Sequence, residues 1–347
     1  MIKSNKTIAL PPGATIKEQL DERSISQKEF AMRMEMSEKH ISKLINGEVL
    51  LTTEMALKLE MVLGIPAKFW LNLEAIYREK LVRIELENNM ESDYEYATKF
   101  PYKKMAALNW IPKTTSKNEQ VANLRKFFEV SRLGLLFEND KINIFCRKML
   151  KSEKSDYYLM AWAQKAKLEA RNIETAKINI DGIKESLNKF RKMTLNPPQY
   201  FCKELKDELA KNGVALVLLP HIEGSFLHGA TFYDKNKIVL GLTARGKDAD
   251  KFWFSFFHEI GHIILGHLNQ NYYVQMEDEA NLFSRNTLIP VDEYNKFINK
   301  NEFSERSIIE FSNKINIDFG IVVGRLQKDN YIPYTKYNNL KTKYIIE

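Results

Sequence analysis

The chain has 347 residues, which is long enough for two or three domains of about 150 residues each. Its hydrophobic content of 44% and charged content of 28% are ordinary for a globular protein, and no apolar run approaches the roughly 20 residues that cross a membrane. The first residues lack the apolar core of a secretory signal, and the two cysteines, Cys146 and Cys202, predict no disulfide framework. We therefore expect a cytoplasmic protein with no membrane partner.

The net charge of +7 is concentrated in the middle of the chain. By segment it is +1 for residues 1–80, +7 for residues 81–195 and −1 for residues 196–347. A basic excess is compatible with phosphate binding, but a chain rich in lysine with a solvated helical surface explains it nearly as well. Charge alone therefore does not identify a nucleic-acid-binding protein.

Residues 14–78 have the pattern of five short helices, each with apolar residues three and four positions apart and each bounded by a cap or a breaker. Ser26 is the expected N-cap of one of them, Glu29 completes a capping box, and Ser37 caps the next helix. Asn46-Gly47 ends that second helix. Two short capped helices joined by a tight turn have the spacing of a helix-turn-helix.

This spacing also predicts which side chains of the two helices face inward and which face outward. The apolar side chains expected to pack inside are Phe30, Ala31, Met34, Ile41 and Leu44. The polar side chains expected to face base edges from the second helix are Glu38, Lys39, Ser42 and Lys43.

The stretch from "SQKEFA" to "KLINGE" resembles the XRE, or lambda-repressor-like, helix-turn-helix family, and is similar to HigA-type antitoxins in particular. The resemblance continues through "LTTEMALKLEMVLGIPAKFWLNLEAIYRE". It implies a five-helix domain that binds double-stranded operator DNA, with Gln27 on the DNA backbone and a recognition helix that starts near Ser37. Where the family commonly has a glycine in the turn, this chain has Glu35, which costs about 1 kcal/mol in the left-handed conformation. A helical bundle that binds only protein is the alternative.

Residues 81–195 have a mostly helical pattern, with Pro101 and Pro112 marking turns around a short helix. Their aromatic residues lie in amphipathic stretches, so they are expected to pack helix against helix rather than to bind a cofactor. No catalytic constellation is visible in this part of the sequence. We predict a linking region, with dimerisation as a further role.

From residue 196 the pattern changes to a helix, a strand, and then two strands joined by a polar turn at residues 234–237. A helix follows over residues 248–267, with aromatic and isoleucine side chains toward the core. His258 and His262 lie one turn apart and project together from its other side, so both can reach one ion. Zinc binds neutral imidazoles at about 2.0–2.1 Å, and this spacing supplies two of them from a rigid support.

A catalytic zinc needs a third protein ligand, and the next predicted helix offers one. Glu277 is the predicted ligand, with Glu279 as the alternative because the start of that helix is uncertain by a residue or two. Asn281 is expected to orient a ligand by a hydrogen bond. Glu259 lies beside the histidine pair, where its carboxylate can accept a proton from the attacking water and deliver it to the leaving amine. His267 does not fit the HExxHxxGxxH spacing, so it is predicted to lie on the polar surface at the helix end or to support a ligand.

The segment "HEIGH", followed in order by "EDEANLF" and "LIP", resembles the ImmA/IrrE family of metallopeptidases, and "SIIEFSNKINIDFGIVVGRLQKDNYIPY" resembles the helical tail of fused proteins with an XRE domain. The resemblance implies a small gluzincin-like domain in which His258, His262 and a glutamate bind Zn²⁺ and Glu259 is the general base. Two positions depart from the family's pattern, with Ser284 in place of alanine and Phe232 in place of arginine.

These observations predict an α+β, mostly α fold in three parts. The parts are a DNA-binding domain over residues 1–80, a helical linking region over 81–195 and a zincin-like metallopeptidase domain over 196–347. The predicted function is that of a homodimeric transcriptional regulator with a zinc endopeptidase domain that cleaves a partner protein, either a repressor or a toxin-system component. One alternative is a HigA-like antitoxin or autorepressor whose zinc domain only binds or senses. The other is a structural module in which "HEIGH" is part of the core.

Overall fold

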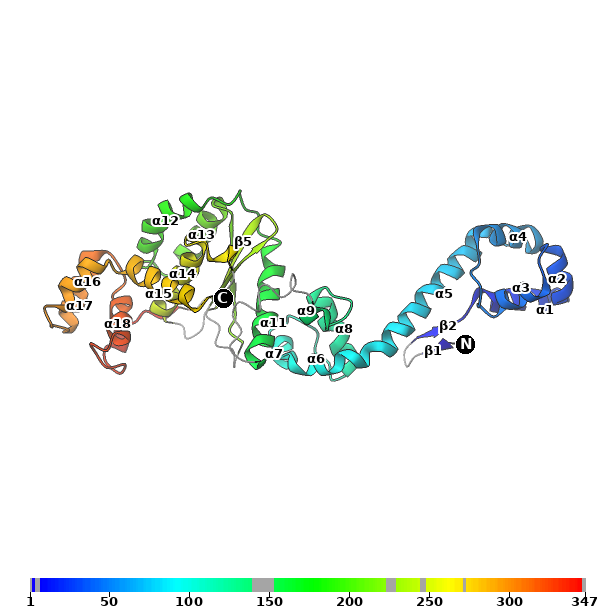
Figure 1. Ribbon diagram of the computed structural model, residues 1–347, viewed down its shortest axis with the longest axis horizontal. Coiled ribbons are helices and arrows are strands. Elements are labelled where there is room, and N and C mark those ends of the chain that lie inside the picture. Colours follow the sequence, from blue (N-terminus) through cyan, green and yellow to red (C-terminus); the bar gives the residue numbers. More distant parts are fainter. Residues whose placement is uncertain are drawn as a thin grey trace. The chain divides into compact units, whose positions relative to one another are not determined.

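The computed structural model describes residues 2–3, 7–138, 153–222, 229–243, 248–270 and 273–344, so Cys146 lies outside the described residues. The chain divides into two compact units, Met1–Glu95 and Tyr96–Glu347, whose elements are labelled in Figure 1. The fold is α+β and mostly helical, which confirms the predicted class. None of the described helices is long and apolar enough to span a membrane.

The first unit is a bundle of five helices preceded by a short antiparallel strand pair. Its elements are β1 (Ile2–Lys3), β2 (Ile8–Ala9), α1 (Pro12–Glu22), α2 (Gln27–Arg33), α3 (Glu38–Ile45), α4 (Thr53–Leu63), α5 (Ala67–Asn88) and the 3-10 helix η1 (Asn89–Asp93). α5 has 22 residues and is not short, because no glycine or proline interrupts residues 67–88.

Local sequence accounts for the starts of α2 and α3. The hydroxyl of Ser26 accepts a hydrogen bond from the backbone N–H of Glu29, and the hydroxyl of Ser37 accepts one from that of His40, each at 3.2 Å. Between the two helices Glu35 has φ 53°, the left-handed conformation expected at the turn. The helix-turn-helix is therefore built by capping interactions within one short stretch of chain.

The core of the first unit contains all the side chains predicted to point inward, together with the fully buried Trp70. Trp70 satisfies its indole N–H by donating to the carbonyl of Ile65 at 3.1 Å. Gly13 lies where α1 crosses the end of α3, and a Cβ added there would lie 2.0 Å from the carbonyl oxygen of Ile45. The close approach of α1 and α3 therefore requires glycine at this position.

The second unit consists of helices around a three-stranded sheet. Before the sheet lie α6 (Tyr94–Lys99), α7 (Tyr102–Ala107), α8 (Lys117–Phe128), α9 (Leu135–Glu138), α11 (Glu153–Ala170), α12 (Ile180–Met193) and α13 (Pro198–Lys211). The strands are β3 (Val214–Leu219), β4 (Gly229–Asp234) and β5 (Lys237–Thr243). After them come α14 (Ala249–Ile264), η2 (His267–Asn269), α15 (Val274–Leu288), α16 (Val291–Ile298), α17 (Glu305–Ile315), α18 (Phe319–Lys328) and η3 (Asn338–Leu340).

The sheet has the order β3-β5-β4, with β5 parallel to β3 and antiparallel to β4. Alternate side chains divide between its two faces: Leu216 and Leu240 join the core formed with α12, α13 and α14, whereas Val217 and Val239 pack with α11. The helices on the two sides of β5 can be followed in Figure 1. Because α11 comes from the predicted linking region, part of that region covers one face of the sheet. The division at residues 80 and 195 remains a prediction.

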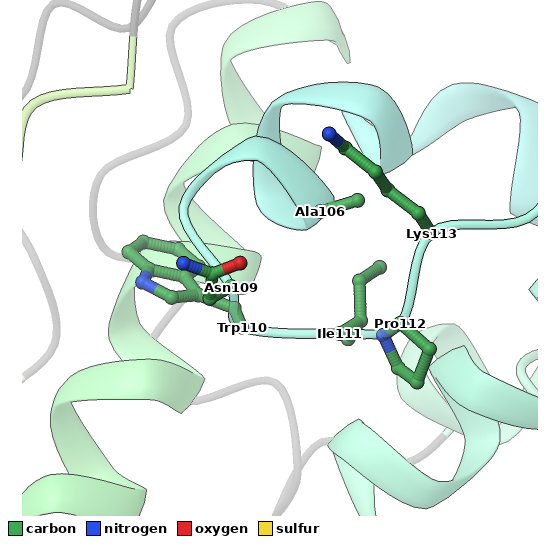
Figure 2. Close-up of a pocket in the computed structure, with 6 residues that line it drawn as sticks. All are labelled: Ala106, Asn109, Trp110, Ile111, Pro112 and Lys113. Atoms are coloured by element: carbon green, nitrogen blue, oxygen red, sulfur yellow. The ribbon is translucent and has the colours of Figure 1, made fainter.

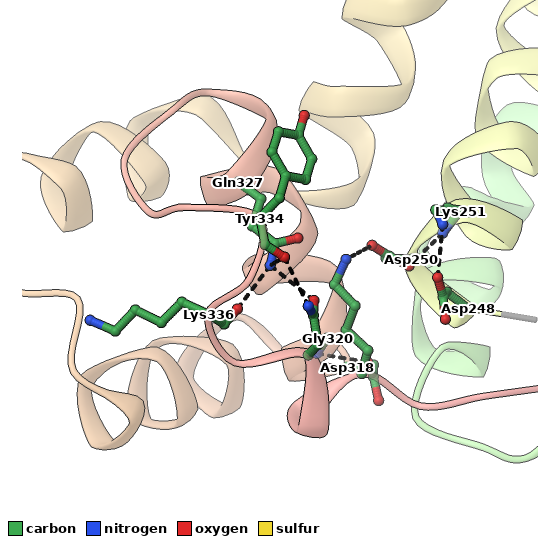
Figure 3. A network of polar contacts seen from close by, with 10 residues as sticks. Asp248, Asp250, Lys251, Asp318, Gly320, Gln327, Tyr334 and Lys336 are labelled. Atoms are coloured by element: carbon green, nitrogen blue, oxygen red, sulfur yellow. Dashed lines mark hydrogen bonds and ion pairs between the residues drawn. The ribbon is translucent and has the colours of Figure 1, made fainter. Parts of the chain in front are cut away.

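Hydrogen bonds tie residues 338–344 to the starts of α14 and α18. Figure 3 shows the surrounding polar network, with Asp250 at the start of α14 and Asp318 at the start of α18. Lys341 Nζ donates to Asp250 Oδ2 at 2.8 Å, with both side chains only 10% exposed. The indole N–H of Trp253 donates to the hydroxyl of Tyr344 at 2.8 Å. The segment thereby anchors the first turn of α14, the helix that carries the two predicted histidine ligands.

Candidate metal centre

α14 is amphipathic, and its apolar side fixes the orientation of its histidines. Trp253, Phe256, Phe257 and Ile260 are completely buried in the main core of the second unit. His258 and His262 project together toward α15, and their side chains remain 15% and 14% exposed. The "HEIGH" stretch thus contributes to the core on one side of the helix and places two partly exposed histidines on the other.

Small residues allow α15 to approach α14 closely at the histidine pair. A Cβ added to Gly261 would lie 3.3 Å from Ala280 Cα and 3.1 Å from Phe283 Cδ1 on α15. One turn further along, the fully buried hydroxyl of Ser284 donates to the carbonyl of Phe254 at 2.8 Å. Ser284 is therefore a hydrogen-bonded link between the two helices.

The close approach places Glu277 opposite the two histidines. The two Nε2 atoms of His258 and His262 lie 3.1 Å apart. Glu277 Oε2 lies 3.5 Å from His258 Nε2, and Glu277 Oε1 lies 3.5 Å from His262 Nε2. With one ligand atom taken from each of the three residues, these atoms lie within 4.8 Å of one another.

This donor set fits a zinc ion. Two ligand atoms of tetrahedral zinc at 2.0–2.1 Å from the ion are about 3.4 Å apart, which is close to each of the separations between the three side chains. Two imidazoles and one carboxylate are a common donor set of catalytic zinc sites, in which a fourth position stays open.

Asn281 fixes the ring of His258. Its Oδ1 lies 3.0 Å from His258 Nδ1, so the imidazole N–H donates to the amide oxygen and the lone pair remains on Nε2. This is the protonation that a metal bound at Nε2 requires. Burial lowers the pKa of His258, but Glu277, Glu259 and Asn281 together outweigh burial and raise this pKa above its ordinary value. Burial and the neighbouring His258 lower the pKa of His262.

Glu259 points from α14 toward β4 rather than toward α15. Thr231 Oγ1 donates to Glu259 Oε2 at 2.6 Å. A Cβ added to Gly229 would lie 2.8 Å from Glu259 Oε1, so the carboxylate packs directly against the glycine backbone. Burial raises the pKa of Glu259 to about 7. Neither Thr231 nor Gly229 is predicted from the sequence as a contact of this carboxylate.

Glu279, the alternative ligand, lies outside the three-residue cluster. Its Oε2 lies 3.0 Å from His267 Nε2, and the Nδ1 atom of His267 lies 2.9 Å from His262 Nδ1. His267 is only 6% exposed, so it does not lie on the polar surface at the helix end. It contacts a predicted ligand instead, which was the other expectation for this residue.

The first unit brings the predicted DNA-contacting residues together on α2 and α3. Gln27 is exposed at the first position of α2, and Ser37 uses its hydroxyl to cap α3. On α3, Ser42 is partly buried and three side chains, Glu38, Lys39 and Lys43, are exposed. Their spacing places them on one accessible face of the helix.

Residues 16–70 match the helix-turn-helix family model, and residues 227–326 match the peptidase-family domain described as IrrE N-terminal-like. The amino-terminal part is also similar to YddM of Escherichia coli strain K12, an uncharacterized HTH-type transcriptional regulator. The two are 46% identical over 63 residues, which is 18% of this chain and 67% of YddM. The chain belongs to the XRE-type helix-turn-helix regulators. It joins to that domain an ImmA/IrrE-like domain of a metallopeptidase family.

The second unit of this helix-turn-helix regulator also has a hollow of about 420 Å³. The residues that line it are distant in sequence from His258 and His262. Figure 2 shows its lining side chains, which come from the end of α7 and the loop that follows: Ala106, Asn109, Trp110, Ile111, Pro112 and Lys113. One lysine is the only charged group among these six. The lining residues offer no pair of acid and base groups, so we assign no chemistry to this hollow.

Proposed function

We propose that this regulator binds operator DNA through its first unit and hydrolyses a peptide bond of a partner protein through a zinc site in its second unit. The observation that supports the second half most directly is the convergence of His258, His262 and Glu277, with Glu259 between the two histidines on the same helix. The packing of a core helix does not by itself require three ligand atoms to lie within 4.8 Å of one another.

In this proposal His258, His262 and Glu277 hold the ion, and Asn281 keeps His258 in the tautomer that binds through Nε2. Zinc, when bound, supplies Lewis acidity toward a water molecule and toward the carbonyl of the scissile peptide bond. Glu259 accepts the proton of the attacking water and delivers it to the leaving amine. Thr231 holds the carboxylate of Glu259 in place by donating a hydrogen bond to Oε2.

For the first unit we propose a dimer that places two copies of α3 in successive major grooves. A two-fold axis between the recognition helices requires an inverted repeat with half-sites about one helical turn apart. The exposed lysines, Lys39 and Lys43, then contact phosphates or base edges. We propose a repressor or a toxin-system component as the cleaved partner, because cleavage of such a protein would link the peptidase to transcription.

The substitution Glu259→Gln tests the peptidase half. Glutamine keeps the shape of the side chain and still accepts the hydrogen bond from Thr231, but it cannot accept the proton of the attacking water. We expect zinc content and operator binding to be unchanged, while cleavage falls by two or more orders of magnitude. The exposed Glu310→Gln makes the same chemical change away from the site and should leave all three properties unchanged.

The substrate can be found by comparing new amino-terminal peptides, by mass spectrometry, in cells that express the wild type or the Glu259→Gln variant. Peptides present only with the wild type identify the cleaved partner. Identical peptide sets, together with normal induction of the target genes in the variant strain, would contradict the proposal. The zinc domain would then regulate by binding or sensing, as in a HigA-like autorepressor.

A further inference from the structure

His267 is a buried histidine with a contact at each ring nitrogen. Its Nδ1 lies 2.9 Å from His262 Nδ1, and its Nε2 lies 3.0 Å from Glu279 Oε2. The side chain of His267 is 5% exposed, whereas that of Glu279 is 60% exposed. The three side chains thus form a chain of contacts that runs from the metal cluster to the solvent.

The backbone after α14 is shaped to make these contacts. α14 ends at Ile264, and Gly266 then adopts the left-handed conformation with φ 74°. This turn starts the 3-10 helix η2 and brings His267 back under the last turn of α14. A Cβ at Gly266 would meet no atom within 4 Å, so the requirement for glycine there is conformational rather than steric.

The protons on these three contacting side chains can be assigned by elimination. His262 Nε2 faces His258 and Glu277, so binding of a cation there requires its lone pair and places the proton on Nδ1. His267 Nδ1 must then accept that proton's hydrogen bond, which places the proton of His267 on Nε2. A carboxylate can only accept, and Glu279 lies at that position. Each of the three groups therefore has one role that is consistent with its neighbours.

The same contacts argue against His267 as a metal ligand. Each of its nitrogens already has a contact. The contact with the cluster is made to Nδ1 of His262, whereas Nε2 of His262 is the atom that faces His258. Glu279 is likewise directed to His267 and not to the Nε2 atoms of the cluster. His267 and Glu279 therefore contact the predicted ligand His262 through its Nδ1 atom.

We propose that His267 and Glu279 are positioning residues that hold His262 in the Nδ1–H tautomer and in the ring orientation needed to bind a metal through Nε2. This inference rests on the proposed zinc site but not on peptide hydrolysis. Asn281 performs the same task for His258 with one hydrogen bond. For His262 the task takes two residues, because the carboxylate reaches the ligand only through a second imidazole.

Zinc affinity of the full-length protein, measured by competition with a chromophoric chelator, provides the first test. His267→Leu removes the acceptor, and we expect the dissociation constant of zinc to rise about 10–100-fold. His267→Asn carries an amide oxygen near the position of Nδ1, so it should recover most of that loss. Glu279→Gln keeps an acceptor oxygen and should resemble the wild type, whereas Glu279→Leu should weaken zinc less than His267→Leu does.

Imidazole tautomers provide a second readout that a loss of packing would not reproduce. Long-range ¹H–¹⁵N spectra of protein labelled at its six histidines report which nitrogen of each ring carries the proton. We expect the Nδ1–H form for His262 and the Nε2–H form for His267 in the wild type. Glu279→Leu should convert part of His267 to the Nδ1–H form, which cannot accept from His262.

The outcomes separate this inference from the proposed function. If His267→Leu binds zinc as tightly as the wild type, or if His267 carries its proton on Nδ1, the positioning role is wrong even for an active peptidase. If the affinities and tautomers follow the expected order but the wild type cleaves no protein, the positioning role stands and the peptidase proposal fails. His267→Asn binding as weakly as His267→Leu would also overturn the inference.

Discussion

The two units of this regulator build their candidate sites in opposite ways. In the first unit every residue predicted to contact DNA lies between Gln27 and Lys43, on two helices whose caps are formed within the same stretch. In the second unit the site combines α14, α15, η2 and β4, and its contacts join residues up to 28 positions apart. A surface site made of adjacent residues depends on local helix formation, whereas a buried one depends on how separate elements pack.

The largest effect that distinguishes the units should come from removal of a metal ligand. His262→Ala leaves two ligands, which do not hold the ion tightly, so zinc content should fall from about one per chain to near zero. Operator binding by the first unit should persist, because the described core of that unit is built from side chains between Ile16 and Leu73. Metal analysis and gel-shift titration of the purified variant measure the two properties, and a joint loss of both would show that the units depend on each other.

Glu277→Gln and Glu279→Gln form a matched pair for the same site, since each removes one negative charge from α15. Glu277 contacts both Nε2 atoms, so its loss should remove most of the bound zinc. Glu279→Gln should retain zinc, because glutamine can still accept from His267. The reverse ranking in metal analysis would identify Glu279 as the third ligand.

A large effect confined to the first unit is expected from Gly13→Ala. The added Cβ would overlap the backbone of Ile45, so α1 and α3 must separate, at a cost of about 3 kcal/mol or more. The thermal unfolding of the first unit and its operator affinity should both decrease, while zinc content stays the same. Gly64→Ala is the control, since its site has φ 71° but no atom within 4 Å, and it should cost about 1 kcal/mol.

An intermediate effect is expected from the exposed lysines of α3. Lys39→Ala or Lys43→Ala should weaken operator binding by about 1–3 kcal/mol if the side chain reads a base, or lower the salt dependence of log K by about one unit if it contacts a phosphate. Lys300→Ala removes the same charge from an exposed position of the second unit. Footprints at several salt concentrations would contradict the proposed interface if all three variants behaved alike.

The smallest effect should come from Thr231→Val, which removes the hydrogen bond to Glu259 and keeps the size of the side chain. Cleavage should fall about tenfold, since a lost hydrogen bond to a buried charged group costs about 1.5–3 kcal/mol and only part of that affects the transition state. Zinc content should not change. Cleavage equal to that of the wild type would remove Thr231 from the proposed mechanism.

The sequence predicts features that depend on neighbouring residues better than features that depend on packing. The caps at Ser26 and Ser37 and the cluster of His258 with His262 follow from helical spacing. Glu277 could be favoured over Glu279 only by assuming where α15 begins. The contact of Thr231 with Glu259 was not predictable, because it depends on the position of β4 against α14.

His267 illustrates the same limit. A spacing of five residues from His262 places it about 140° around a continuous helix, so helical periodicity cannot bring the two rings together. The contact arises because the helix stops and Gly266 reverses the chain. The sequence signal that could have indicated this was the glycine directly before the histidine, which is typical of a helix end.

The anchoring of α14 by residues 338–344 has a consequence for the order in which the protein matures on the ribosome. The partners of Asp250 and Trp253 in this contact, Lys341 and Tyr344, are each synthesised 91 residues later. At about 5–20 residues per second this delay is roughly 5–18 seconds. The core residues of the first unit, Ile16 to Trp70, are synthesised before α14 begins. If the first unit binds an operator as proposed, a newly made chain can engage it before residues 338–344 fix the first turn of α14. Any proteolytic activity of the proposed site would then begin only after these residues have been made.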